Sequence, residues 1–336
     1  MDFEVIRDRL GRRYAADLGE PIREPSQRPG RSERPGRFHR YSDRYSAYGR
    51  LTRWQPMLVV AAAVAVIAVA VAFVGRETTL GNAVRQHDWA AASCLGFSIA
   101  FLVAKSALLR DSAAACGIQV RLLSTARVFC EGVAVEAAAW PGKLWADGYR
   151  FAMLDSSAAR AARLRAVILF RAATLSSGVI LASAAVLTLA EAPIPATAAS
   201  LILLLAASVW LIVRLQGHWT VAFFPRATRL IALSLSARIF DITAATLVAS
   251  FVTGVPMYGF SAYFIWISLG AGMSGIPLGF GVLDLALGVA LTHVFQIGVA
   301  DATAAIVIYR AFGPGITLLV GAVGLTARFR RSTKPM

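Results

Sequence analysis

The sequence predicts an all-α, polytopic transmembrane helix bundle, and three observations support this class. Hydrophobic residues make up 57% of the 336 residues, against about 45–50% in a soluble domain. Charged residues make up only 16% and are clustered along the chain. Between the clusters lie uncharged runs that provide most or all of the length of a spanning helix, at 56–75, 89–104, 172–190, 192–213, 242–283, 285–300 and 311–327.

Proline and glycine interrupt the apolar sequence at two places. The first break is at Pro141 and Gly142, and the second contains Pro277, Gly279 and Gly281. A break in a membrane helix frees backbone N–H and C=O groups, which lipid cannot satisfy. Such a break must therefore lie inside protein or against a water-filled cavity. Paired breaks in the two halves of a chain indicate the substrate site of a transporter-like protein.

The positions of Lys and Arg predict the topology, because short cytoplasmic loops are enriched in both. Unbroken helices are expected at about 56–75, 89–109, 167–190, 194–213, 229–252 and 302–326. The basic loops and both termini all lie on the cytoplasmic side if each broken segment enters and leaves the membrane on one side. We therefore expect two re-entrant hairpins, at 122–150 and 259–300, arranged as an inverted pair that meets near the midplane. The alternative is two full spans in each broken region.

Three parts of the chain follow from these assignments. Residues 1–50 are polar and rich in Arg and Pro, which predicts a disordered cytoplasmic tail. Residues 51–328 form the transmembrane domain, and 329–336 a short basic cytoplasmic tail. The expected location is the inner or plasma membrane.

Charged residues within or beside the spans are the candidate substrate-binding residues. A charge at the centre of a membrane helix costs about 2.5–3.5 kcal/mol on insertion scales, so it usually faces the protein interior. Arg238 and Asp241 are three residues apart on one helix and can pair with each other. This pairing is either purely structural or part of substrate handling. The full candidate set is Lys143, Asp147, Arg150, Arg238, Asp241, Asp284 and Arg310.

Several other functions are not supported by the sequence. The three cysteines and four histidines show no metal-ligand spacing, so neither a metal nor another cofactor is expected. Gly270-Ala-Gly-Met-Ser-Gly275 matches a dinucleotide-binding pattern but lies in an uncharged apolar run, where close helix packing explains it better. The net charge of +15 lies mainly in the tail and loops, which is typical of cytoplasmic flanks and gives little support for nucleic-acid binding.

At the two breaks the chain resembles the transmembrane region of lysylphosphatidylglycerol synthases, the flippase-like integral membrane family. The resemblance covers about residues 56–328. Its motifs are Pro141-Gly-Lys143-Leu with a following acid and Arg150, Ile276-Pro-Leu-Gly-Phe-Gly-Val-Leu-Asp284, Gly298-Val299, and Ile308-Tyr-Arg310. The family usually has Gly-Glu where this chain has Trp145-Ala-Asp147, and Glu where it has Asp284.

The resemblance implies lipid translocation or an unassigned role in envelope lipid handling. No counterpart of the soluble aminoacyl-transfer domain is present, so we expect no enzymatic activity of that kind. The leading hypothesis is the flipping of a polar-headed lipid, with membrane lipids as partners and the oligomeric state open. Lys143, Arg150 and Arg310 would contact phosphate, while Asp147, Asp241 and Asp284 would pair with cations or bind a basic headgroup. The alternatives are a secondary transporter of a soluble ion or metabolite and a non-catalytic membrane scaffold.

Overall fold

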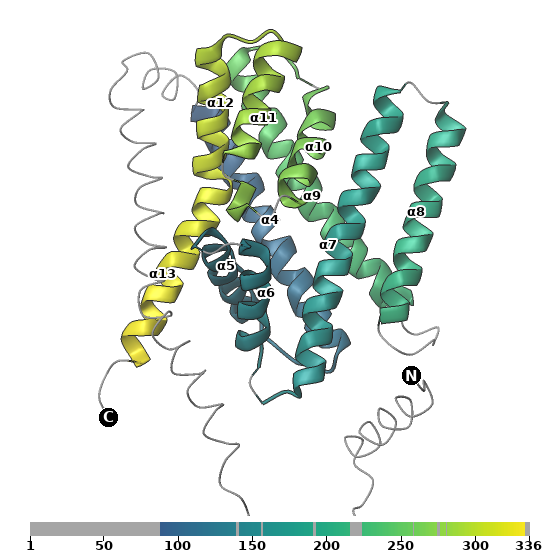
Figure 1. Cartoon of the computed structure of the whole chain (residues 1–336), viewed down its shortest axis with the longest axis vertical. Helices are drawn as coiled ribbons and strands as arrows, with labels where there is room; N and C mark the ends of the chain where they lie inside the picture. The colour runs from purple at the N-terminus through teal and green to yellow at the C-terminus, as the bar shows by residue number, and fades with distance from the viewer. Residues whose placement is uncertain are drawn as a thin grey trace, which may run out of the picture. The chain divides into compact units, whose positions relative to one another are not determined.

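A computed structural model describes residues 88–332, with gaps at 139–140, 156, 191–192, 216–223, 258, 274–275 and 280. The predicted tail at 1–50 and the predicted helix at 56–75 lie outside the described residues. Within the described part every regular element is helical (Figure 1). The elements are α4 (Asp88–Ala115), α5 (Leu122–Ala138), α6 (Gly142–Met153), α7 (Arg160–Leu189), α8 (Ile194–Leu215), α9 (Phe224–Thr253), α10 (Phe260–Met273), the 3-10 turn η2 (Pro277–Gly279), α11 (Val282–Val289), the π-turn η3 (Ala290–Val294), α12 (Val299–Phe312) and α13 (Pro314–Ser332).

Five helical stretches in the described part are long and apolar enough to cross a membrane. They are Trp89–Ala115, Arg160–Leu189, Ile194–Leu215, Phe224–Thr253 and Val299–Arg328. A multi-pass membrane protein is therefore indicated, as the composition predicts. Four of the stretches contain or closely match predicted helices. They extend these helices mainly at their basic ends, because long basic side chains let a helix continue beyond its apolar run.

The helix predicted at 302–326 is instead two helices, α12 and α13, which meet at Gly313. The reason is local. Pro314 has no N–H and has the backbone angle of a first helical residue, so it starts α13. The N–H of Gly313 bonds the carbonyl of Tyr309 at 2.8 Å and ends α12. The sequence Gly313-Pro314-Gly315 is thus a third interruption, which the sequence reading missed.

Both predicted breaks are present in the structure. Pro141 lies immediately before α6 with extended backbone angles, and the chain between α10 and α11 forms the short turn η2. Three residues of the second break, Leu278, Gly279 and Gly281, have positive φ angles of 49°, 63° and 80°. Glycine adopts such angles without a steric penalty, whereas Leu278 is strained there.

The two broken segments occupy different ends of the bundle. In Figure 1, α5 and α6 lie in the lower part, and α10 and α11 lie in the upper part. The long helices α4, α7 and α9 run past both. The chain passes from the lower end of α4 into α5 and from α6 into the lower end of α7, so the first broken segment starts and finishes at one end (Figure 1).

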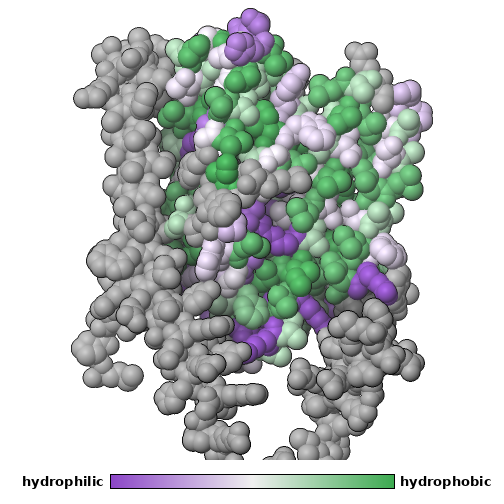
Figure 2. All heavy atoms as spheres, in the orientation of Figure 1, coloured by the Kyte–Doolittle hydropathy of each residue, from purple (hydrophilic) through white to green (hydrophobic). Residues whose placement is uncertain are grey.

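Apolar packing forms two main clusters. One joins α4, α5, α7, α8 and α9 around Leu108, Phe129, Phe170 and Ile212. The other joins α9 to α12 and includes Phe264. Seen from outside in Figure 2, a hydrophilic patch lies midway down a largely hydrophobic face. The polar groups are thus gathered within the apolar height of the bundle as well as at its ends.

Candidate functional site

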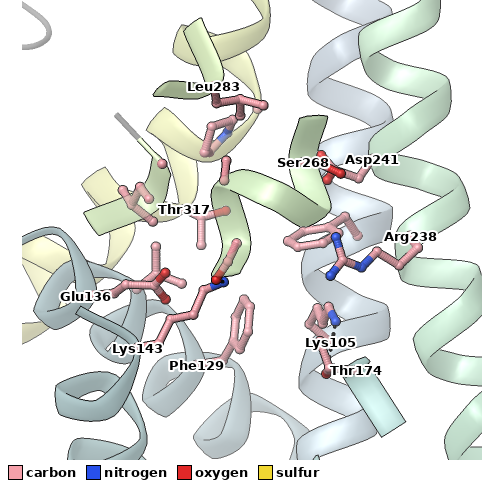
Figure 3. A pocket seen from close by; sticks show the side chains of 18 of the residues that line it. Lys105, Phe129, Glu136, Lys143, Thr174, Arg238, Asp241, Ser268, Leu283 and Thr317 are labelled. Carbon is pink, nitrogen blue, oxygen red and sulfur yellow. Dashed lines mark hydrogen bonds between the residues drawn. The ribbon is translucent and has the colours of Figure 1, made fainter. Parts of the chain in front are cut away.

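A cavity of about 230 Å³ lies where the two broken segments meet. Its lining comes from α5 and α6 on one side and from α10, η2 and α11 on the other. The long helices α4, α7 and α9, together with the junction of α12 and α13, complete the wall. Figure 3 shows Lys143 and Glu136 on one side of the cavity, and Lys105, Arg238 and Asp241 on the other.

Positive charge dominates this cavity. Six cationic side chains line it, against two carboxylates, Glu136 and Asp241. The cations are Lys105, Lys143, Arg150, Arg171, Arg238 and Arg310. The first turns of three helices also face it, with Lys143 from α6, Leu283 from α11 and Thr317 from α13. Helix N-termini carry free N–H groups and a partial positive charge, so these first turns add to the attraction for an anion.

The first break brings two arginines to one carboxylate. Arg150 bonds Asp147 at 2.9 Å, and the Nε of Arg171 on α7 bonds the other oxygen of Asp147. Arg150 is 2% exposed, and its guanidinium lies 5.4 Å from the ring centres of both Phe129 and Phe170. Arg150 is therefore a buried part of the cavity wall, held by charge and by two aromatic faces.

The second break is held by Arg310. Its Nε lies 2.5 Å from Asp284, and its other nitrogens donate to the carbonyls of Leu278 at 3.2 Å and Gly279 at 3.3 Å. Asp284 also accepts the N–H of Gly281 at 3.0 Å, one turn before it on the chain. One arginine thus satisfies backbone oxygens that the break releases and binds the carboxylate that caps α11.

Lys143 joins the two breaks. Its Nζ donates to the carbonyl of Gly272, in the last turn of α10 (Figure 3). A lysine is long enough to reach across the cavity while its stem packs against the wall. The two interruptions are therefore in contact with each other.

The predicted pair between Arg238 and Asp241 is wrong. Asp241 accepts a hydrogen bond from the hydroxyl of Tyr309 at 2.8 Å. Within the described residues no ion pair includes Arg238, and its Nε is buried without a hydrogen-bond partner. Spacing by three places two residues on one helix face, but it does not force the side chains together when a better partner approaches from another helix.

Of the seven predicted site residues, five line the cavity, and Asp147 and Asp284 each bind an arginine that does. The sequence reading missed Lys105 and Arg171. Lys105 lies within the helix predicted at 89–109, which continues as α4 to Ala115, and it is only 4% exposed. The available signal was a lysine next to a 16-residue uncharged run, the same argument that identified Arg238.

A second polar cluster lies outside the cavity. Glu131 on α5 is fully buried and accepts bonds from Arg127 at 2.7 Å, Tyr149 at 2.6 Å and Arg328 at 3.0 Å. It connects α5, α6 and α13, and its carboxylate is fully partnered. No group of three or more potential metal ligands occurs among the residues that the structure describes, and the three cysteines there are free thiols.

No protein-family model and no curated protein matches this chain. The resemblance to the lysylphosphatidylglycerol synthase membrane region therefore stays a prediction based on its motifs.

Proposed function

We propose that this membrane protein translocates the polar headgroup of a phosphate-bearing lipid between leaflets through the cavity between the two breaks. The observation that carries the proposal is the excess of cationic side chains at a cavity inside an apolar helix bundle. Buried charges are costly in a membrane protein and are retained at substrate pathways. A lipid needs a protein path only for its headgroup, since its hydrocarbon tails remain in the bilayer.

The hairpin arrangement is part of this proposal. Each broken segment would enter and leave on its own side, and the two would meet at the contact between Lys143 and Gly272. Support comes from the chain path, which starts and finishes the first segment at one end of the bundle. The basic starts of α7 and α9 lie at that same end, which favours the cytoplasm as its location.

The motif resemblance supports the same assignment. Three of its four motifs supply residues at the cavity: Lys143, Arg150, Gly279 and Arg310 line it, and Asp284 binds Arg310, whereas Gly298-Val299 does not line it. Motifs that are far apart in the sequence thus converge on one site, which is the pattern expected of a substrate pathway. The proposal includes no chemical step and no cofactor.

Proteoliposomes that contain phospholipids with a fluorescent tail provide the test. A membrane-impermeant quencher reports the fraction of label in the outer leaflet with time. We expect the wild-type chain to accelerate exchange and Arg150→Gln and Asp284→Asn to reduce it strongly. Arg160→Gln, at the exposed start of α7, is the control and should leave exchange unchanged.

Two outcomes would contradict the proposal. Exchange at the rate of empty liposomes would remove the translocation function. Uptake of a soluble anion driven by an ion gradient, without lipid exchange, would favour a secondary transporter. Normal exchange in both variants would leave the function in place but remove these residues from the path.

A further inference from the structure

The cations of the cavity differ in the groups that they bind. Arg150 and Arg171 share Asp147, and Arg310 binds Asp284. Lys143 is bonded to the carbonyl of Gly272. These four cations are therefore engaged in holding the breaks together.

Within the described residues, three lining cations have no carboxylate within ion-pair distance: Lys105, Lys143 and Arg238. Lys143 donates to the carbonyl of Gly272 between the breaks, which leaves Lys105 and Arg238. Lys105 is 4% exposed, and its hydrogen bond goes to the neutral hydroxyl of Thr174 at 3.3 Å. Asp241 lies on the same side of the cavity, but it accepts the hydroxyl of Tyr309 and forms no ion pair with Lys105 or Arg238. Burial of a cation without an ion-pair partner is costly. An anion bound here would therefore form favourable charge-assisted bonds with both side chains.

Both cations lie on the same side of the cavity (Figure 3). Lys105 comes from α4 and Arg238 from α9, and the hydroxyls of Ser98 and Ser268 also line the cavity. An ammonium and a planar guanidinium with hydroxyl donors suit the oxygens of a phosphate. A volume of about 230 Å³ has room for several groups the size of a water molecule, at about 30 Å³ each. A phosphate and its glycerol link therefore fit.

A second, much smaller cavity of about 10 Å³ shares Arg238, Asp241 and Ser268 with the first, and we call this space between α7, α9 and α10 the seam. Its lining is Gly178 and Leu181 of α7, Arg238, Asp241 and Ile242 of α9, and Ile265, Ser268 and Leu269 of α10. The apolar side chains along it are part-exposed. Gly178 leaves this space open, because a Cβ there would lie 3.3 Å from Leu269 and 3.7 Å from Arg238.

We propose that Lys105 and Arg238 bind the phosphate of an anionic phospholipid whose acyl chains leave through the seam between α7, α9 and α10. The inference rests on the proposed function and adds the headgroup class, the binding residues and the exit. An anion joined to hydrocarbon matches a cationic cavity beside a seam that Leu181, Ile242, Ile265 and Leu269 help to line. Free phosphate would use the same two cations but would not need the seam.

The test measures binding to the full chain in a neutral detergent with three probes: dioctanoyl phosphatidic acid, dioctanoylglycerol and inorganic phosphate. We expect phosphatidic acid to bind best. The diacylglycerol lacks the phosphate and should bind at least about tenfold more weakly, the ratio expected for a lost charge-assisted bond. Inorganic phosphate should compete, but only at higher concentration.

The variants separate the two parts of the site. Arg238→Gln and Lys105→Met should each weaken phosphatidic acid binding about 10- to 100-fold. Arg229→Gln is the matched control on the same helix, because Arg229 is 62% exposed at its start and pairs with Asp111. Gly178→Leu should weaken phosphatidic acid and leave inorganic phosphate unchanged. If Arg238→Gln does not fold, Arg238→Lys keeps the charge, loses the fork and should bind with intermediate affinity.

Three results would overturn the inference. Equal binding of phosphatidic acid and dioctanoylglycerol to the wild-type chain would exclude a phosphate subsite without any variant. Unchanged binding in folded Arg238→Gln would exclude this location. Inorganic phosphate binding as tightly as the lipid, with no effect of Gly178→Leu, would assign the site to a free anion.

The failure of the inference is distinguishable from the failure of the proposed function. If neither Lys105→Met nor Arg238→Gln changes the rate of lipid exchange in proteoliposomes, the subsite is excluded while the translocation function remains. Specific phosphatidic acid binding without any exchange would sink translocation and leave the subsite standing.

Discussion

Lys143 and Gly272, 129 residues apart in the sequence, are joined by a hydrogen bond from the lysine Nζ to the glycine carbonyl. The lysine starts α6 just after the first break, and the glycine lies in the last turn of α10 just before the second. The bond satisfies a carbonyl that the end of α10 would otherwise leave unpaired. It therefore links directly the two interruptions, which the sequence alone relates only because each has proline and glycine within an apolar run.

Replacement of Lys143 by Met should loosen this link. A hydrogen bond from a charged donor contributes about 1.5–3 kcal/mol, so the thermal unfolding midpoint in detergent should fall by several degrees. Lipid exchange should fall as well, because the breaks lose their fixed separation. Arg160→Met removes an exposed cation at the start of α7 and serves as control. An unchanged midpoint in Lys143→Met would show that the contact carries no stability.

Arg310 and Asp284 should be energetically coupled. Asp284→Asn leaves the arginine, which is 11% exposed, without its counter-charge while its carbonyl bonds remain. A double-mutant cycle with Arg310→Gln, measured by thermal unfolding, should give a coupling of about 1–3 kcal/mol. Strictly additive effects would contradict the assignment of this pair to the second break.

Gly279→Ala should destabilise the second break. Gly279 has a φ of +63°, and a Cβ there would lie 3.0 Å from the Cβ of Ala271. Strain and crowding together should cost about 1–3 kcal/mol. The control is Gly270→Ala in α10, where a Cβ meets nothing within 4 Å. That substitution should be neutral or slightly stabilising, because alanine favours helix more than glycine does. Equal midpoints for the two variants would contradict the proposed strain.

Gly321→Ala should separate α13 from α5. A Cβ at Gly321 would run into the carbonyl of Cys130 on α5, and backbone cannot move aside as a flexible side chain can. Overpacking of this kind costs about 1–3 kcal/mol. Gly96→Ala in α4, where a Cβ has open space, is the matched control. A chain that tolerates both substitutions equally in a thermal unfolding assay would show that the close approach of α5 and α13 is not required.

Lys105→Met should raise the stability of the ligand-free chain while it weakens anion binding. Replacement of an uncompensated buried charge by an apolar side chain of similar length is stabilising by about 1–4 kcal/mol where packing is kept. Arg127→Met should have the opposite sign, because it withdraws a partner from the buried carboxylate of Glu131. Thermal unfolding of the three chains side by side measures both effects. A fall in midpoint for Lys105→Met would indicate that the lysine supports structure rather than a ligand.

The sequence by itself determined the class of fold, four of the long helices and the two breaks. These features depend on local properties: the length of an apolar run, the missing N–H of proline and the conformational freedom of glycine. The cost of an intramembrane charge also placed Arg238 and Asp241 inside the protein before any partner was known. The third break at Gly313-Pro314 was equally local and was available from the same signal.

Only the tertiary structure decided which charges neutralise each other. Asp147 binds Arg171, 24 residues away, and Asp241 binds Tyr309, 68 residues away, in preference to its neighbour Arg238. Such choices depend on which helices pack side by side and how closely, as the contact of Gly321 with Cys130 illustrates. Local periodicity in the sequence does not determine that packing. It is the packing that leaves Lys105 and Arg238 together at the cavity without a carboxylate of their own.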